Sequence, residues 1–99
     1  MTKEELDQFV IKTFKQVASD NEKILLTEPG ADTAIMGGDS VFDSVDLVTF
    51  IVALEQGLED ERNISIILAD DRAMSQEVSP FRTIGSISDY IEMLVKEQA

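Results

Sequence analysis

The segment Asp43-Ser44-Val45-Asp46-Leu47-Val48 places one hydroxyl between two carboxylates, directly before an apolar run. Asp43 and Ser44 are residue types that cap helices, so we expect a helix to begin here with the Ser44 hydroxyl exposed at its start. A phosphodiester on that hydroxyl would meet the backbone N–H groups of the first turn and the positive end of the helix dipole. The plainer alternative is that Ser44 is only an N-cap and carries nothing.

The rest of the composition argues against catalysis. The 99 residues include no His and no Cys, which removes the commonest general base and the thiol nucleophile. A calcium-binding loop counted from Asp39 also fails, because its sixth position is Ser44 instead of glycine and its twelfth is Phe50 instead of glutamate. We therefore expect no enzyme activity and assign no catalytic residue.

Negative charge is concentrated around Ser44. Twenty acidic and eight basic residues give a net charge of −12, and no Lys or Arg occurs between Lys23 and Arg62. Such a surface repels nucleic acid and attracts proteins that carry basic patches. The main alternative to a modified protein is thus an unmodified acidic adaptor or inhibitor, in which these carboxylates mimic a polyanion for a basic partner.

Helices are predicted to hold this segment in place. Thr2 and Glu5 have capping-box spacing before apolar residues at helical intervals, which predicts a helix over about 3–19. Residues 20–42 contain Pro29-Gly30 and Gly37-Gly38 and are predicted to be a long connection. A second helix over about 44–60 has two apolar stripes, so we expect it to be buried around most of its circumference. The stripes are Leu47, Ile51, Leu54 and Leu58, and Val45, Val48 and Val52.

The C-terminal part of the chain completes the predicted fold. Residues 63–67 are too short and isolated for a sheet strand and are predicted to be an extended connector, followed by a short helix over 68–75. Thr83 is predicted to cap a last helix that buries Ile84, Ile87, Ile91, Leu94 and Val95. The prediction is an all-α, irregular four-helix bundle of three principal helices and one short helix, forming a single domain over 1–99. No signal-peptide pattern and no apolar run long enough to cross a bilayer occur, so we expect a cytoplasmic protein without membrane insertion. We also expect it to be a monomer.

The segment at Ser44 resembles the phosphopantetheine attachment motif of acyl carrier proteins, Asp-Ser-Leu-Asp/Glu followed by an apolar helix. The resemblance continues through residues 50–55 and resumes in Thr83-Ile84-Gly85 to Asp89-Tyr90-Ile91. It implies a 4'-phosphopantetheine arm on Ser44, attached by a phosphopantetheinyl transferase. Acyl or aminoacyl groups would be carried on that arm as thioesters and delivered to synthase or ligase enzymes of fatty-acid, polyketide or related biosynthesis.

The resemblance also implies roles for acidic residues. Asp43 and Asp46 would help to bind the transferase without acting as bases. Partner enzymes with basic patches would contact the polar side of the second helix, for which we select Asp46, Thr49, Gln56 and Asp60. Thr49 stands where many family members have an acidic residue, which indicates a different choice of partners.

Ser40 is the rival modification site. It lies in Gly37-Gly38-Asp39-Ser40, which is similar to a stretch in the carrier domains of peptide synthetases. However, its spacing to Ala53-Leu54-Glu55 is four residues too long, about one helical turn. The connector from Asp60 to Thr83 is also longer than in the simplest fatty-acid carriers, which favours a specialised biosynthetic pathway.

Overall fold

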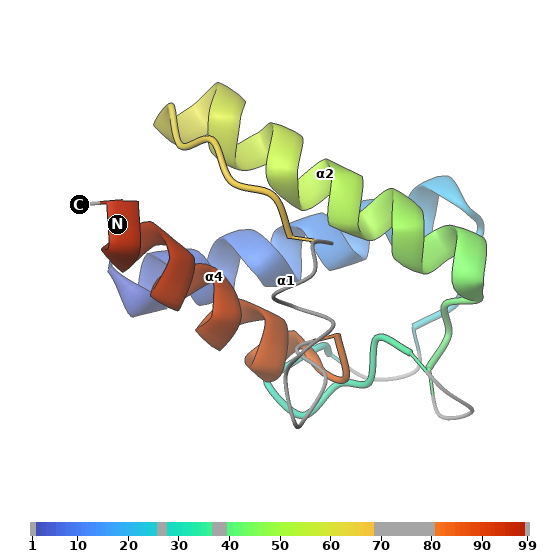
Figure 1. The fold of residues 1–99 in the computed structure, drawn as a ribbon. Helices are drawn as coiled ribbons and strands as arrows, with labels where there is room; N and C mark the ends of the chain where they lie inside the picture. Colours follow the sequence, from blue (N-terminus) through green and yellow to red (C-terminus); the bar gives the residue numbers. More distant parts are fainter. Residues whose placement is uncertain (1, 26–27, 37–39, 69–80, 99) are drawn as a thin grey trace.

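The fold is built from helices that share one core (Figure 1). The computed structural model describes residues 2–25, 28–36, 40–68 and 81–98, without the side chains of Ser44 and Gln98. Within these ranges the chain forms α1 (Lys3–Asp20), α2 (Ser44–Arg62) and α4 (Ile84–Gln98), and no strand beyond an isolated bridge. The three principal helices are thereby confirmed as a small helical bundle. The short helix predicted over 68–75 falls, after its first residue, outside the described part of the chain.

Side-chain caps fix where α1 and α4 begin. The Thr2 hydroxyl accepts a hydrogen bond from the Glu5 N–H at 3.1 Å, and the Glu5 carboxylate accepts one from the Thr2 N–H at 3.2 Å. At α4 the Thr83 hydroxyl accepts from the Ser86 N–H at 3.0 Å, and the Ser86 hydroxyl accepts from the Thr83 N–H at 2.9 Å. Both caps predicted from the sequence are confirmed, the second with Ser86 in the place usually taken by Glu or Gln.

α1 contacts both α2 and α4, and its predicted apolar face forms the centre of the core. The side chains at helical spacing are buried as expected, because a stripe of about 100° must be covered by the neighbouring helices. The buried residues of α1 are Leu6, Phe9, Val10, Phe14, Val17 and Ala18. The buried apolar residues of α2 and α4 are Phe50, Ile51, Leu54 and Leu58, with Ile84, Ile87, Tyr90 and Ile91. Leu47, Leu94 and Val95, which were also expected to be buried, are only half-buried at the edge of the core.

The first loop is bound to the beginning of α4. Ala34 and Thr83 form an isolated antiparallel bridge, and the Gly85 N–H donates to the Ala31 carbonyl oxygen at 2.8 Å. A Cβ atom at Gly85 would lie 2.9 Å from that same oxygen. The close approach therefore requires glycine at position 85. The hydrogen bond and the bridge hold the long first loop against the beginning of α4.

The chain that follows α2 is an extended connector, as predicted. Asn63 ends α2 in the left-handed region at φ 56°, which Asn tolerates better than most residues. Residues 63–68 then run back along α2 (Figure 1), and the Leu68 N–H donates to the Glu55 carboxylate at 2.9 Å. Leu68 is fully buried, so the connector closes one side of the core.

Across the described ranges, α1, α2 and α4 are all too short or too polar to span a lipid bilayer.

Candidate functional site

The start of α2 is closed by two aspartates. The Asp43 carboxylate accepts a hydrogen bond from the Asp46 N–H at 2.8 Å, and the Asp46 carboxylate accepts one from the Asp43 N–H at 3.1 Å. Asp43 is thus the N-cap and Ser44 is the first residue of the helix. The expectation that Ser44 itself is the N-cap is wrong, because Asp43 is the residue before the helix and its carboxylate makes the capping bond. Whether Ser44 is modified stays a prediction.

Asp46 does not lie on the exposed side of α2. Only 5% of its surface is exposed, and its Oδ2 atom lies 3.2 Å from the Lys23 ammonium nitrogen. The hydrogen bond from the Asp43 N–H holds the pKa of the Asp46 carboxyl below its usual value; burial opposes this effect and Lys23 adds to it. The expectation that Asp46 lies on the outward, polar side of α2 is therefore wrong, because capping turns this carboxylate inward.

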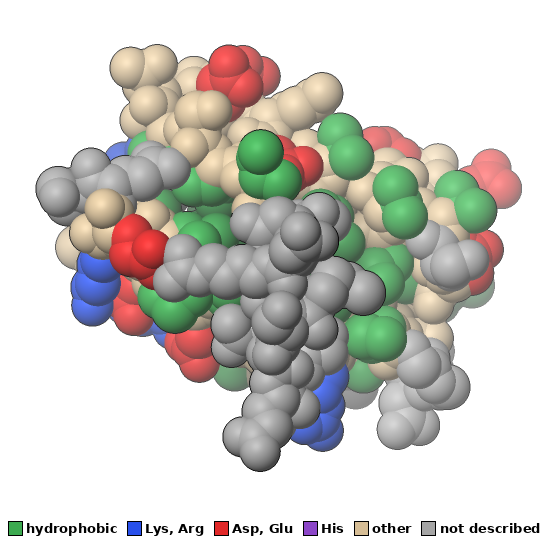
Figure 2. All heavy atoms as spheres, viewed as in Figure 1, with side chains coloured by type: hydrophobic (Ala, Val, Ile, Leu, Met, Phe, Trp, Pro, Cys, Tyr) green, Lys and Arg blue, Asp and Glu red, His purple; other side chains and the backbone are tan. Residues whose placement is uncertain are grey.

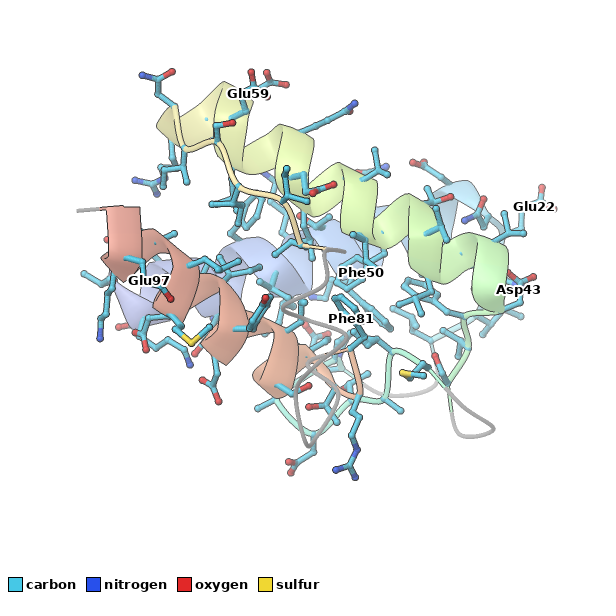
Figure 3. The ribbon with its side chains drawn as sticks, viewed as in Figure 1. Glu22, Asp43, Phe50, Glu59, Phe81 and Glu97 are labelled. Atoms are coloured by element: carbon cyan, nitrogen blue, oxygen red, sulfur yellow. The ribbon has the colours of Figure 1, made fainter. Side chains whose placement is uncertain are left out.

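An aromatic cluster anchors the residue before the cap. Phe42 is buried, and its ring centroid lies 4.6 Å from that of Phe14 on α1 and 5.6 Å from that of Phe50 on α2. Phe14 and Phe50 also meet edge to face at 5.8 Å, and Figure 3 shows Phe50 pointing into the bundle. Since Phe42 directly precedes Asp43, these contacts fix the position of the cap and of Ser44 relative to the core.

The outward side of α2 differs from the prediction. Val45, Val48 and Val52 are 71%, 60% and 43% exposed, so the expected burial around most of the helix is wrong. The buried side of α2, which carries Phe50, Ile51, Leu54 and Leu58, packs on α1, and within the described part of the chain no other helix contacts α2. Figure 2 shows hydrophobic side chains following one another along α2.

Three of the four residues selected for partner binding do lie on this outward side. Thr49, Gln56 and Asp60 are exposed. Residues 45, 49, 52, 56 and 60 recur at three- and four-residue intervals and so share one side of a helix. We call the set Val45, Val48, Thr49, Val52, Gln56 and Asp60 the outer α2 face. Its N-terminal half is apolar and its C-terminal half is polar and acidic.

Ser40 lies in a different environment from Ser44. It precedes the helix by four residues, is half-buried, and its hydroxyl accepts a hydrogen bond from the Phe42 N–H at 3.0 Å. The side chain of Ser44 is outside what the structure describes, so the expected exposure of its hydroxyl stays a prediction. Asp43 beside it is exposed.

Other features of the described surface do not add to this site. A shallow hollow of about 350 Å³ lies on the outside of α1, lined by residues such as Ile11, Lys12 and Lys15, and includes no residue of α2. Among the described residues no cluster of three or more Asp, Glu, His or Cys side chains could hold a metal ion.

The chain matches no protein-family model, and comparisons with curated proteins and with solved structures give no significant match. The residues of the chain and their arrangement therefore carry the functional argument.

Sequence reasoning missed two parts of this site. The partnership of Lys23 with Asp46 joins residues 23 positions apart through a loop, and no local pattern specifies it. The anchoring role of Phe42 has a weak signal, since a large apolar residue directly before an N-cap often packs against the helix that follows.

Proposed function

We propose that this chain is an acyl carrier protein with an irregular four-helix fold, which carries 4'-phosphopantetheine on Ser44 and has no catalysis of its own. The observation that carries the proposal is the Asp43-Ser44-Val45-Asp46 motif at the first turn of a long, core-anchored helix. A phosphopantetheinyl transferase would attach the arm, whose terminal thiol would supply the thiol group that a chain without cysteine lacks.

The start of α2 suits a phosphodiester. The first N–H groups of a helix have no partner within the helix, and the helix dipole places partial positive charge there. The Asp46 N–H is taken by the Asp43 carboxylate. Backbone donors nearer to Ser44 are the ones expected to face a phosphate on this residue.

The outer α2 face supports docking of enzymes that act on the arm. It begins one residue after Ser44, so a protein bound there has its active site within reach of the arm. Its three exposed valines offer apolar area, and Asp60 adds negative charge in a region that has no Lys or Arg from residue 24 to 61. The partner it fits is an enzyme with an apolar depression bordered by basic side chains.

Docking can be tested with the transferase as the partner. Val48→Lys and Asp60→Lys should slow uptake of the arm, whereas Gln16→Lys on the outside of α1 should not, although Val48→Lys and Gln16→Lys change the net charge equally. Added salt should weaken the wild-type interaction, because the Debye length falls from about 10 Å at 0.1 M to about 3 Å at 1 M. Equal rates of arm uptake for Val48→Lys and Gln16→Lys would show that the transferase does not dock on the outer α2 face.

The modification itself is tested by incubating the unmodified protein with coenzyme A, magnesium and a broad-specificity phosphopantetheinyl transferase. The wild type and Ser40→Ala should gain the mass of the arm, and Ser44→Ala should not. Circular dichroism checks that Ser44→Ala still folds, which we expect because Asp43 supplies the cap. A wild type that gains no mass with several transferases points to the unmodified acidic adaptor instead.

A further inference from the structure

We propose that Lys23 is a positioning residue of the modification site: its ammonium group holds the Asp46 carboxylate against the backbone and so fixes the turn that contains Ser44 for the transferase. The inference rests on the carrier function proposed above. It extends the site to a residue 21 positions before Ser44 in the sequence.

The end of α1 fixes the backbone of Lys23. The Lys23 N–H donates to the Ala18 carbonyl at 2.8 Å, and the Glu22 N–H donates to the Ser19 carbonyl at 3.1 Å. This pair of bonds is the Schellman pattern, which requires the residue before Lys23 to be left-handed. Glu22 has φ 60°, a conformation that costs a non-glycine residue energy. The backbone position from which the Lys23 side chain extends is therefore fixed.

Lys23 and the α2 cap meet at a single oxygen atom. Asp46 Oδ2 lies 3.2 Å from the Lys23 ammonium nitrogen and accepts the Asp43 N–H at 3.1 Å. The Asp46 side chain is 6% exposed and that of Lys23 is 32% exposed, so this pair is more shielded from water than the surface pairs. Figure 3 places Glu22 and Asp43 at the same end of the molecule. Without Lys23, a buried carboxylate would lose its opposite charge.

Lys23 also places a positive charge near the negatively charged modification site. The phosphodiester would add a negative charge beside Asp43 and Asp46. Lys23 is the last cation in the sequence before Arg62. Arg62 pairs with Glu5 at the far end of α2, as Lys12 does with Glu61. The ammonium of Lys23 thus offsets part of the charge that accumulates around Ser44.

The test compares initial rates of arm uptake, measured by intact mass, with a broad-specificity transferase, coenzyme A and magnesium. Lys23→Met should lower the rate about tenfold, which corresponds to about 1.4 kcal/mol. Lys23→Arg should keep most of the rate, because a guanidinium can also hold the carboxylate. Lys12→Met is the matched control: it makes the same charge change, breaks a pair between α1 and the other end of α2, and should load at close to the wild-type rate.

A double mutant separates positioning from general damage. If Lys23 acts through Asp46, then Lys23→Met added to Asp46→Asn should slow uptake no further than Asp46→Asn alone. Circular dichroism checks that each variant is folded. Wild-type rates for a folded Lys23→Met, equal slowing by Lys12→Met, or additive effects in the double mutant would overturn the inference while leaving the carrier function intact. A wild type that takes up no arm would overturn both.

Discussion

Replacement of Gly85 by alanine should destabilise the protein, although alanine is the better helix former. The Gly85 N–H is bonded to the Ala31 carbonyl oxygen at 2.8 Å, and an added Cβ would lie 2.9 Å from that oxygen and 3.2 Å from the Ala31 Cβ. Backbone atoms cannot turn aside as a flexible side chain can. The first loop would have to move away from α4.

The magnitudes decide the sign of this effect. Alanine gains up to about 1 kcal/mol over glycine in a helix interior, and less in a first turn. Against this, overpacking costs about 1–3 kcal/mol, and the loss of a hydrogen bond costs about 0.5–1.5 kcal/mol. We expect the free energy of unfolding to fall by about 1–3 kcal/mol.

Urea unfolding followed by circular dichroism measures this change. A loss of about 2 kcal/mol should lower the midpoint by about 0.7–2 M, since small proteins have slopes of about 1–3 kcal/mol/M in urea. Gly30→Ala is the matched control, because, apart from its two chain neighbours, no heavy atom of the described residues lies within 4 Å of the position of its Cβ. A Gly85→Ala protein as stable as the wild type, or an equal loss in Gly30→Ala, would refute the close approach of the loop to α4.

Three further predictions concern the start of α2 and the charge of the chain. Phe42→Ala should lower the free energy of unfolding by about 3–5 kcal/mol in urea titrations, because its buried ring packs on two others; a loss below about 1 kcal/mol would contradict the anchoring role. Asp46→Asn should be less stable than the wild type at neutral pH. Because folding lowers the pKa of Asp46, its contribution to stability is complete above the unfolded pKa of roughly 4 and is lost as pH falls through the folded pKa. The melting temperatures of the two proteins should therefore converge in acid; a difference that does not change with pH would show that ionisation of Asp46 does not stabilise the fold. Finally, raising ionic strength at neutral pH should raise the melting temperature, since a net charge of −12 repels itself, and a salt-independent curve would contradict that repulsion.

Local patterns were sufficient to predict the three principal helices. The Thr2–Glu5 and Thr83 caps lie next to regular apolar spacing, so propensity, capping and burial agree at both α1 and α4. The bounds of α2 were also close, since the cap and the apolar stripe begin together. These features depend on residues within a few positions of each other.

The exposure of α2 could not be predicted in the same way. Val45, Val48 and Val52 have the types and spacing of a buried stripe, yet they are exposed because no described helix packs on that side. Which face of an apolar helix is covered depends on where the other helices lie. Periodicity alone does not contain that information.

The charged residues show a second feature that local sequence patterns cannot predict. Asp46 has the type and spacing of a surface acid, but the cap and Lys23 turn it inward. Side-chain partners that are distant in sequence decide this orientation, as they do for the bond between Leu68 and Glu55. The sequence therefore predicted where α2 begins and the N-cap chemistry of the candidate site, and the structure was needed for the contacts that support it.

The carrier function is tested most directly by the intact mass of the protein purified from its own host, followed by fragmentation that locates any added group. We expect a mass increase equal to phosphopantetheine, with or without an acyl group, located on Ser44. A protein that is wholly unmodified in growing cells, or one that carries the arm on Ser40, would contradict it.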